Sequence, residues 1–228
     1  MIDDGFIWSK TELNNVLCDG KPRRTTSGEV VKVDKVVVDM LVFKDKNGKE
    51  FSYPIGATKD DGLFSSIVAS EVIDSYPPYL KRGIKRVSFH LIDNPLDPFW
   101  REEYKNPGHK SAASDGGNIN FWNTPKDKDD FKGITAHEAG HILDGDRKDC
   151  SSSKAWQEAV SRDDVFAKNL KGSYRVSEYA KTNDGEDFAE CIKAYIIDHD
   201  NFKKYFPYRA AYIRKMAQQQ SGHSPKSP

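Results

Sequence analysis

The sequence contains little cysteine and no paired cysteine motif. Only Cys18, Cys150 and Cys191 occur among its 228 residues, and no two of them form a CxxC pair. An odd number of widely spaced cysteines argues against a disulfide framework and against a thiolate zinc site. We therefore expect a reducing compartment or a bacterial setting. A chain of this length can bury a hydrophobic core without disulfide bonds.

The chain also lacks an excess of charge of either sign. Thirty-five basic and thirty-five acidic residues give a formal net charge of zero. A dedicated nucleic-acid binder needs a basic surface, so no nucleic-acid partner is expected. Charged residues make up 31% of the chain, aromatic residues 11%, and the mean hydropathy is −0.74. This composition predicts a folded domain with a polar surface.

Long hydrophobic runs are missing as well. The most apolar run, residues 36–43, contains Asp39 and is far shorter than the roughly 20 residues of a membrane helix. The first residues carry acids where a signal peptide has basic residues, and no apolar stretch follows them. We expect no membrane span and a monomer that stays in the cytoplasm of the producing cell, or leaves it by a non-classical route or as a mature fragment.

The apolar pattern predicts strands in the first half of the chain and helices in the second. Asn47-Gly48 lies between two runs of strand formers and predicts a hairpin over 29–44 and 49–55. Further strands are expected over 84–92 and 118–122, with a long irregular loop over 94–117. The expected helices cover 61–75, 128–144, 152–170 and 185–217, the last broken at Pro207.

This order of elements favours an α+β fold with a small mixed β-sheet in the N-terminal half and a helical C-terminal half. We expect an irregular segment over 1–28 and a main domain over 29–217. Within that domain, a strand-rich lobe covers 29–92 and a helical lobe covers 118–217. The tail, 218–228, is rich in Gln, Ser and Pro, and its composition predicts disorder.

A zinc-binding pattern lies in the helix expected over 128–144. His137-Glu138-Ala139-Gly140-His141 matches HExxH. Histidines four residues apart lie on one helix face, so both reach one metal ion, and Glu138 points toward the metal-bound water. Gly140 leaves room for a neighbouring segment, and Asp129 or Asp130 is the expected N-cap. The apolar residues fall on the back of the helix: Phe131, Ala139, Ile142 and Leu143.

Chance alone would produce an HExxH in roughly one such sequence in a hundred, given six histidines. The pattern therefore predicts Zn²⁺ held by His137 and His141. The chemistry expected of such a site is hydrolysis of a protein or peptide substrate, with zinc-activated water as nucleophile and Glu138 as general base.

A catalytic zinc needs a third protein ligand. The metzincin spacing is excluded, because Asp144 and Arg147 occupy the positions of its glycine and third histidine. The remaining carboxylate and histidine candidates downstream are Asp146, Glu158, Glu178, Glu186, Glu190 and His199.

Glu186 and Glu190 lie four residues apart, on the helix face opposite an apolar stripe that includes Phe188 and Ile192. Two interpretations remain open from this pattern alone. The two carboxylates face a metal ion, or they form the solvated acidic face of an ordinary amphipathic helix, which Lys193 on the same side favours.

The motifs resemble those of a known family. His137-Glu138-Ala139-Gly140-His141, then Tyr179, then Glu186-Asp187-Phe188-Ala189-Glu190 resemble the catalytic domain of anthrax lethal factor and its relatives, including the clostridial Pro-Pro endopeptidases. These are gluzincins, zinc peptidases whose third ligand is a glutamate. The resemblance covers about residues 118–195 and does not extend to the first hundred residues.

The resemblance implies zinc bound by His137, His141 and Glu186, with Glu138 as general base and Tyr179 assisting the oxyanion. It places Glu190 outside the ligand set or facing substrate. It also implies a zincin-like fold in which a peptide pairs with an edge strand. The segment 117–122 is the expected edge strand, with Asn118 and Asn120 facing substrate.

The leading hypothesis is thus a zinc metalloendopeptidase, with a bacterial toxin or effector as one setting. The alternatives are a noncatalytic interaction module with a structural zinc, and a structural protein of a phage or mobile element. Elsewhere, His90 is expected to be a packed or edge residue of its strand and not a ligand. Trp100 is expected to line a cleft or anchor its loop, and Arg209 to belong to a solvated basic face.

Overall fold

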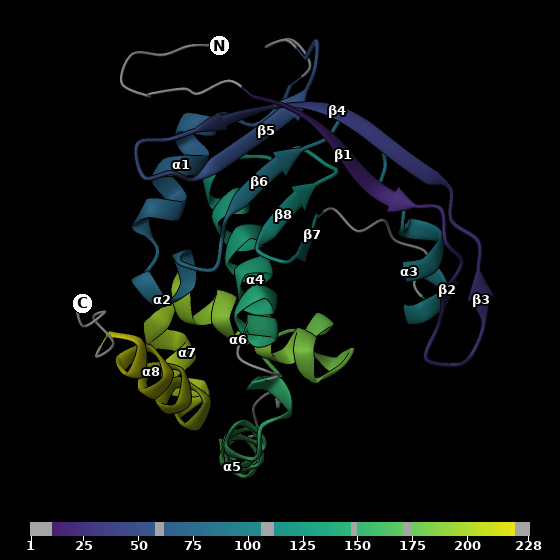
Figure 1. Ribbon diagram of the computed structural model, residues 1–228. Helices are drawn as coiled ribbons and strands as arrows, with labels where there is room; N and C mark the ends of the chain where they lie inside the picture. The colour runs from purple at the N-terminus through teal and green to yellow at the C-terminus, as the bar shows by residue number, and fades with distance from the viewer. Residues whose placement is uncertain (1–10, 58–61, 106–111, 147–149, 171–174, 222–228) are drawn as a thin grey trace, which may run out of the picture. The chain divides into compact units, whose positions relative to one another are not determined.

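The structure, a computed structural model, describes residues 11–57, 62–105, 112–146, 150–170 and 175–221. The chain divides into two compact units. The first contains residues 1–70 and 85–126, and the second contains residues 71–84 and 127–228. Strands lie in the first unit and most helices in the second (Figure 1). The predicted α+β class is confirmed.

The first unit is built on a six-stranded sheet. Its strands, in spatial order, are β1 (Thr11–Asp19), β4 (Lys35–Lys44), β5 (Glu50–Pro54), β6 (Arg86–Phe89), β8 (Asn118–Phe121) and β7 (Ala112–Asp115). β6 runs parallel to both β5 and β8, and the other neighbours are antiparallel, so the sheet is mixed, as predicted. The unit also contains a two-stranded ribbon and one helix: β2 (Arg23–Arg24), β3 (Val30–Val31) and α3 (Asp97–Tyr104).

The predicted hairpin is the β4–β5 pair. Asp45 accepts hydrogen bonds from the backbone N–H groups of Asn47 and Lys49, at 2.8 and 2.9 Å. Gly48 follows with a φ of +77°, a conformation that disfavours residues with a Cβ. The turn therefore forms where Asn47-Gly48 predicts it, although the first strand begins at Lys35 rather than at residue 29.

The two faces of β6 and β8 differ in chemistry because side chains alternate along a strand. Val87, Phe89, Ile119 and Phe121 are buried on one face. The Phe89 ring stacks on Phe121 at 5.4 Å and on Tyr53 of β5 at 5.3 Å. The alternate residues on the other face are polar: Arg86, Ser88, Asn118 and Asn120.

Three sequence-based expectations for this unit are wrong. The described part of the segment 1–28 is not irregular, because it contains β1 and β2. The loop expected over 94–117 contains α3 and β7. β8 is not an edge strand, since β6 pairs with it on one side and β7 on the other. The strand at that end of the sheet is β7.

The second unit is helical. Its α-helices are α2 (Pro78–Lys81), α4 (Lys128–Asp146), α5 (Lys154–Leu170), α6 (Asp184–Ile197), α7 (His199–Tyr205) and α8 (Pro207–Ser221), while α1 (Ser66–Ser75) crosses the division between units. Two short 3₁₀ helices are η2 (Cys150–Ser152) and η3 (Tyr179–Lys181). The predicted break at Pro207 is confirmed, and a second break occurs at Asp198.

The boundaries of most predicted helices and strands differ from the structure by a few residues. Residues 62–65 are not helical, so the helix expected over 61–75 begins later, at Ser66, while residue 61 lies outside the described residues. The tail expected to be disordered from 218 onward is helical as far as Ser221, and residues 222–228 lie outside the described residues.

The core of the second unit forms around α5, α6 and α8. Trp156 of α5 is fully buried, and its ring lies 4.9 Å from Phe188 of α6. Arg209 of α8 is also fully buried, so its predicted place on a solvated face is wrong. The buried carboxylates of Asp163 and Asp187 compensate the charge of the Arg209 guanidinium. Asp163 also accepts a hydrogen bond from the Arg209 backbone N–H at 2.9 Å.

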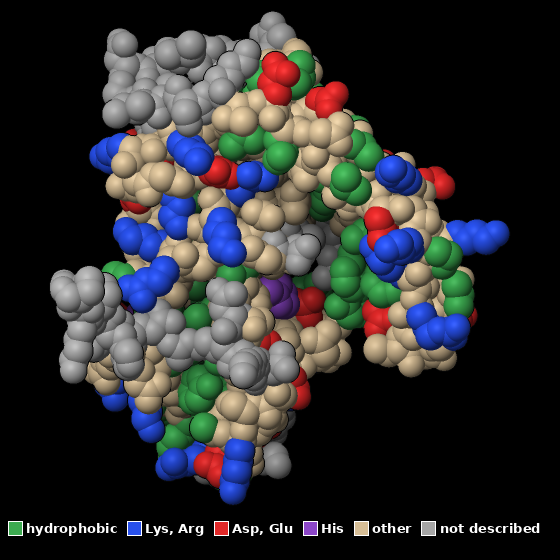
Figure 2. All heavy atoms as spheres, in the orientation of Figure 1, with side chains coloured by type: hydrophobic (Ala, Val, Ile, Leu, Met, Phe, Trp, Pro, Cys, Tyr) green, Lys and Arg blue, Asp and Glu red, His purple; other side chains and the backbone are tan. Residues whose placement is uncertain are grey.

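Both signs of charge are present on the face that Figure 2 shows, where Lys and Arg side chains lie among Asp and Glu side chains. This mixture matches the zero net charge of the sequence. Within the described part of the chain, no helix combines the length and apolar character needed to cross a membrane.

Candidate metal centre

α4 presents the HExxH residues from a packed helix. Its N-cap is Asp127 rather than Asp129 or Asp130, because the Asp127 carboxylate accepts from the backbone N–H of Asp130 at 2.8 Å. The residues predicted for its back are all buried: Phe131, Ala139, Ile142 and Leu143. His137 and Glu138 are buried too, and His141 is half-buried.

α6 brings the acidic residues to α4. Asn183 caps its N-terminus, since its side chain accepts from the backbone N–H of Glu186 at 2.9 Å. Glu186 and Glu190 are 2% and 8% exposed, so they do not form a solvated acidic face. That interpretation is excluded, and the two carboxylates instead contact the histidines of α4.

The close approach of α4 and α6 depends on Gly140. A Cβ at this position would lie 2.9 Å from the backbone Cα of Ala189 and 3.3 Å from the Cβ of Ile192. Real Cβ atoms essentially never come within 3.0 Å of a heavy atom outside their own and the adjacent residues, so one of the two helices would have to move. The prediction that Gly140 makes room for a neighbouring segment is confirmed, and that segment is α6.

Replacing Gly140 with Ala is therefore expected to destabilise the fold. Overpacking costs about 1–3 kcal/mol, and the gain in helix propensity returns roughly 1 kcal/mol of this. Gly133→Ala is the matched control on the same helix, because its Cβ would meet only Lys193 Cε, at an ordinary 3.7 Å. Urea unfolding should show a lower free energy for Gly140→Ala and an equal or higher one for Gly133→Ala. Equal losses would contradict the packing argument.

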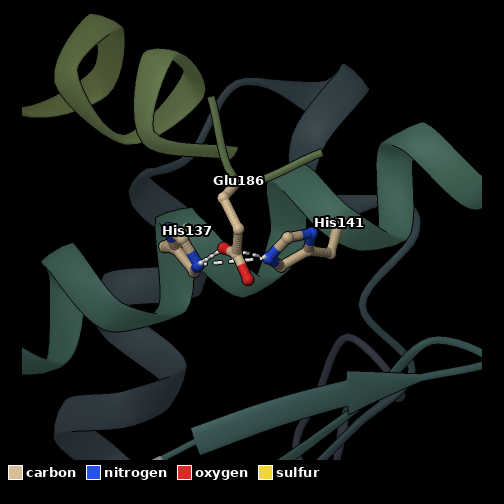
Figure 3. Close-up of side chains that lie close together, drawn as sticks. All are labelled: His137, His141 and Glu186. Atoms are coloured by element: carbon tan, nitrogen blue, oxygen red, sulfur yellow. Dashed lines mark hydrogen bonds and ion pairs between the residues drawn. The ribbon is translucent and has the colours of Figure 1, made fainter. Parts of the chain in front are cut away.

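Three potential ligand atoms form a nearly equilateral triangle. The Nε2 atoms of His137 and His141 lie 3.1 Å apart, and Glu186 Oε2 lies 3.2 Å from the first and 3.1 Å from the second. Figure 3 shows the Glu186 carboxylate reaching from α6 to the two imidazoles of α4.

The triangle fits a metal ion such as zinc. Bonds of about 2.0–2.1 Å in a tetrahedral site separate neighbouring ligand atoms by about 3.3 Å. Two imidazole nitrogens and one carboxylate oxygen are also the donor types that suit Zn²⁺. Among the described residues, His137, His141 and Glu186 form the group that could hold a metal ion. None of the other carboxylates or histidines considered as a third ligand belongs to this group.

Glu190 and Tyr179 contact two members of this triangle from outside it. Glu190 Oε1 lies 2.8 Å from His137 Nδ1, the ring nitrogen outside the triangle. The Tyr179 hydroxyl donates to Glu186 Oε1 at 3.0 Å. Two of the three residues of the triangle, His137 and Glu186, thus have a partner outside it that holds their orientation, an arrangement that is common around protein metal sites.

The electrostatics of this cluster of His137, His141, Glu186 and Glu190 follow from their contacts with one another. Burial lowers the pKa of His137, but its bonds to Glu186 and Glu190 and the charge of Glu138 outweigh it and raise the pKa to about 9. Burial raises the pKa of Glu190, yet the bond to His137 and the nearby Lys193 bring it down to about 2. The cluster therefore holds a proton that a cation would displace.

Sequence reasoning missed the residues that anchor α6. Asp187, next to Glu186, is 1% exposed and accepts from Arg175 Nη1 at 3.0 Å, with Arg209 Nη2 at 3.8 Å. Asn183 has a readable local signal, because an Asn three residues before a Glu is typical of a helix N-terminus. Arg209 has no such local signal in the sequence, because its burial depends on carboxylates from two other helices.

The structure brings together five of the predicted site residues in the second unit: His137, Glu138, His141, Glu186 and Glu190. Tyr179 joins them through Glu186. Asn118 and Asn120 lie on β8 of the first unit, where they line a pocket. No protein-family model and no curated protein sequence matches the chain. The likeness to gluzincins therefore depends on its short motifs.

Proposed function

We propose that the chain is a zinc-dependent metalloendopeptidase with a zincin-like fold. The observation that carries this proposal is the triangle of His137 Nε2, His141 Nε2 and Glu186 Oε2, with Glu138 buried next to the first histidine. The mixed sheet and the HExxH helix also support it. His137, His141 and Glu186 would hold the zinc ion.

Glu138 is the proposed general base. When bound, zinc supplies Lewis-acid chemistry, which polarises a peptide carbonyl and makes water more acidic. The Glu138 carboxylate takes the proton from the attacking water and later returns it to the leaving amine. It is available for this task because it is not one of the three residues that form the triangle.

Tyr179 is the proposed oxyanion donor. Its side chain is 37% exposed, and its hydroxyl bonds to Glu186 Oε1 at the edge of the cluster. A rotation of this exposed ring would turn the hydroxyl from Glu186 to a developing oxyanion. The resemblance to gluzincins supports the same role.

Glu190 is proposed to fix the tautomer of His137. Because its carboxylate accepts from Nδ1–H, the lone pair of Nε2 points into the triangle. Glu190→Gln should therefore keep the fold but weaken zinc binding by about 10–100-fold. Competition with a chelator measures this affinity, and Glu158→Gln on the exposed face of α5 is the control. Unchanged affinity would show that Glu190 does not position His137.

A noncatalytic module with a structural zinc is the competing function, including one carried by a phage or mobile element. A structural site has no use for a general base and is usually closed by four ligands. Glu138 beside the triangle and three ligand residues therefore favour a peptidase. A secreted toxin or effector is one setting compatible with this activity.

The direct test is cleavage of a proteome-derived peptide library by the zinc-loaded protein. New termini should appear and vanish when zinc is removed with a chelator, then return when zinc is restored. Cleavage that persists without metal would point to a contaminating protease. A zinc-loaded protein that cleaves no library peptide and no folded protein would favour the noncatalytic module.

A further inference from the structure

The first unit contains a pocket that the proposed peptidase chemistry does not use. Its volume is about 410 Å³, within the range of small-molecule sites. Side chains from β1, β6, β8, α3 and the segments beside them line it. The lining includes four amides and two indoles: Asn15, Asn94, Asn118, Asn120, Trp100 and Trp122.

The floor of the pocket is the polar face of two central strands. Arg86 pairs with Asn118 and Ser88 with Asn120 in the register of β6 and β8, so these four side chains lie side by side. Both strands have neighbours on each side, and their backbone groups are engaged in the sheet. A ligand on this floor would therefore be recognised by side chains. A peptide could not add to the sheet here, because neither strand has a free edge.

Among the described residues that line the pocket, no charged side chain is unpaired. Arg86 is the one charged residue among the described residues of the lining, and its Nε donates to Glu50 Oε2 at 2.8 Å. Ser88 accepts from Ser52 Oγ at 2.7 Å. A phosphate or another strongly charged ligand would need free counter-charges, so this chemistry favours a neutral ligand.

The walls contain donors without partners. Asn94 is 4% exposed, and its Oδ1 accepts from Leu96 N at 2.9 Å, but its Nδ2 has no partner in the described structure. Nε1 of Trp122 also has no partner in the described structure. The Trp122 ring stacks on the His90 ring, with the ring centres 4.3 Å apart. His90 is itself buried, and its Nε2 lies 3.0 Å from Asn120 Oδ1. Unpaired donors are costly, so oxygen acceptors are expected beside this wall.

We propose that this pocket binds a neutral saccharide. Vicinal hydroxyls both accept and donate, which matches the paired donor and acceptor of an Asn amide. The apolar C–H face of a sugar ring packs on an indole, and both Trp100 and Trp122 keep accessible ring surface because they are half-buried. Hydroxyl and ring oxygens also supply acceptors for the donors of Asn94 and Trp122, after small side-chain rotations.

The proposal is tested on the full, zinc-free chain with the indole N–H signals of an ¹⁵N-labelled sample. The probes are glucose, galactose, mannose, N-acetylglucosamine and their β-linked disaccharides. A capped alanine dipeptide and inorganic phosphate are the comparison ligands. At least one saccharide should shift the signals of Trp100 and Trp122, assigned by single Trp→Phe variants. The signal of Trp156, buried in the second unit, should not move.

Two adjacent residues of β1 provide a matched pair of variants. Asn15 lines the pocket, whereas Asn14 is exposed and donates to Asp39 Oδ1 at 3.0 Å. Asn15→Ala and Asn120→Ala should each weaken saccharide binding by about tenfold, and Asn14→Ala should leave it unchanged. Asn15→Ala remains informative if Asn120→Ala misfolds.

Three results would overturn the proposal. The first is that no saccharide shifts the indole signals at millimolar concentration in a folded sample. The second is that only the dipeptide or phosphate shifts them. The third is an equal loss of saccharide affinity in Asn14→Ala and Asn15→Ala. Because the readout needs neither zinc nor turnover, it is independent of the peptidase proposal.

Discussion

Glu138→Gln is expected to retain zinc and to lose peptidase turnover by about 10²–10⁴-fold, the range that a positioned acid–base group contributes. Gln keeps the size and hydrogen-bonding capacity of Glu but does not accept the proton of the attacking water. Glu138 is also absent from the triangle of ligand atoms, so the metal site should survive the change. Turnover is measured as kcat/KM on a peptide from the library, and zinc by elemental analysis.

The matched control for this substitution is Glu178→Gln. Glu178 precedes Tyr179, its side chain is 88% exposed, and it pairs with Lys181 on the surface. The same chemical change there should leave kcat/KM and zinc content unchanged. Full turnover in zinc-bound Glu138→Gln would exclude Glu138 as the base. Loss of zinc together with turnover would show that Glu138 supports the metal site.

The two helices of the site were predictable because their signals are local. The HExxH spacing, the buried back of α4 and the apolar stripe of α6 are all read within a few turns of helix. Gly140 was predictable for the same reason, since a glycine between two ligands implies a close neighbour. What the sequence left open was whether Glu186 and Glu190 form a solvated face or a buried one. Their contacts with the histidines of α4 show that they are buried.

The missed elements depend on partners distant in the sequence. β1 contains Asn14 and Asn15 in its middle, so its alternation is weak, and pairing with β4 makes it a strand. α3 begins with Asp97-Pro98, and Pro in a first turn is compatible with a helix although it resembles a loop signal. Arg209 was expected in solvent because its buried partners lie about 20 to 45 residues away.

Glu186→Ala is expected to abolish stoichiometric zinc binding. It removes one corner of the triangle and leaves two imidazoles, and it also removes the acceptor of the Tyr179 hydroxyl. The loss of affinity should exceed the roughly 10–100-fold expected for a partner outside the ligand set, such as Glu190. Dialysis against a chelator followed by elemental analysis measures the retained metal, and circular dichroism verifies the fold.

Comparison of Glu186 with Glu190 makes this result decisive. Both carboxylates are buried against histidines of α4, but Glu186 contacts the two Nε2 atoms whereas Glu190 contacts Nδ1 of His137. The proposed ligand set therefore requires zinc to be absent in Glu186→Ala and zinc affinity to be lower in Glu190→Gln. Stoichiometric zinc in a folded Glu186→Ala, with none in Glu190→Gln, would exchange the two roles. In that case the ligand nitrogen of His137 would be Nδ1, and the triangle would not be the metal site.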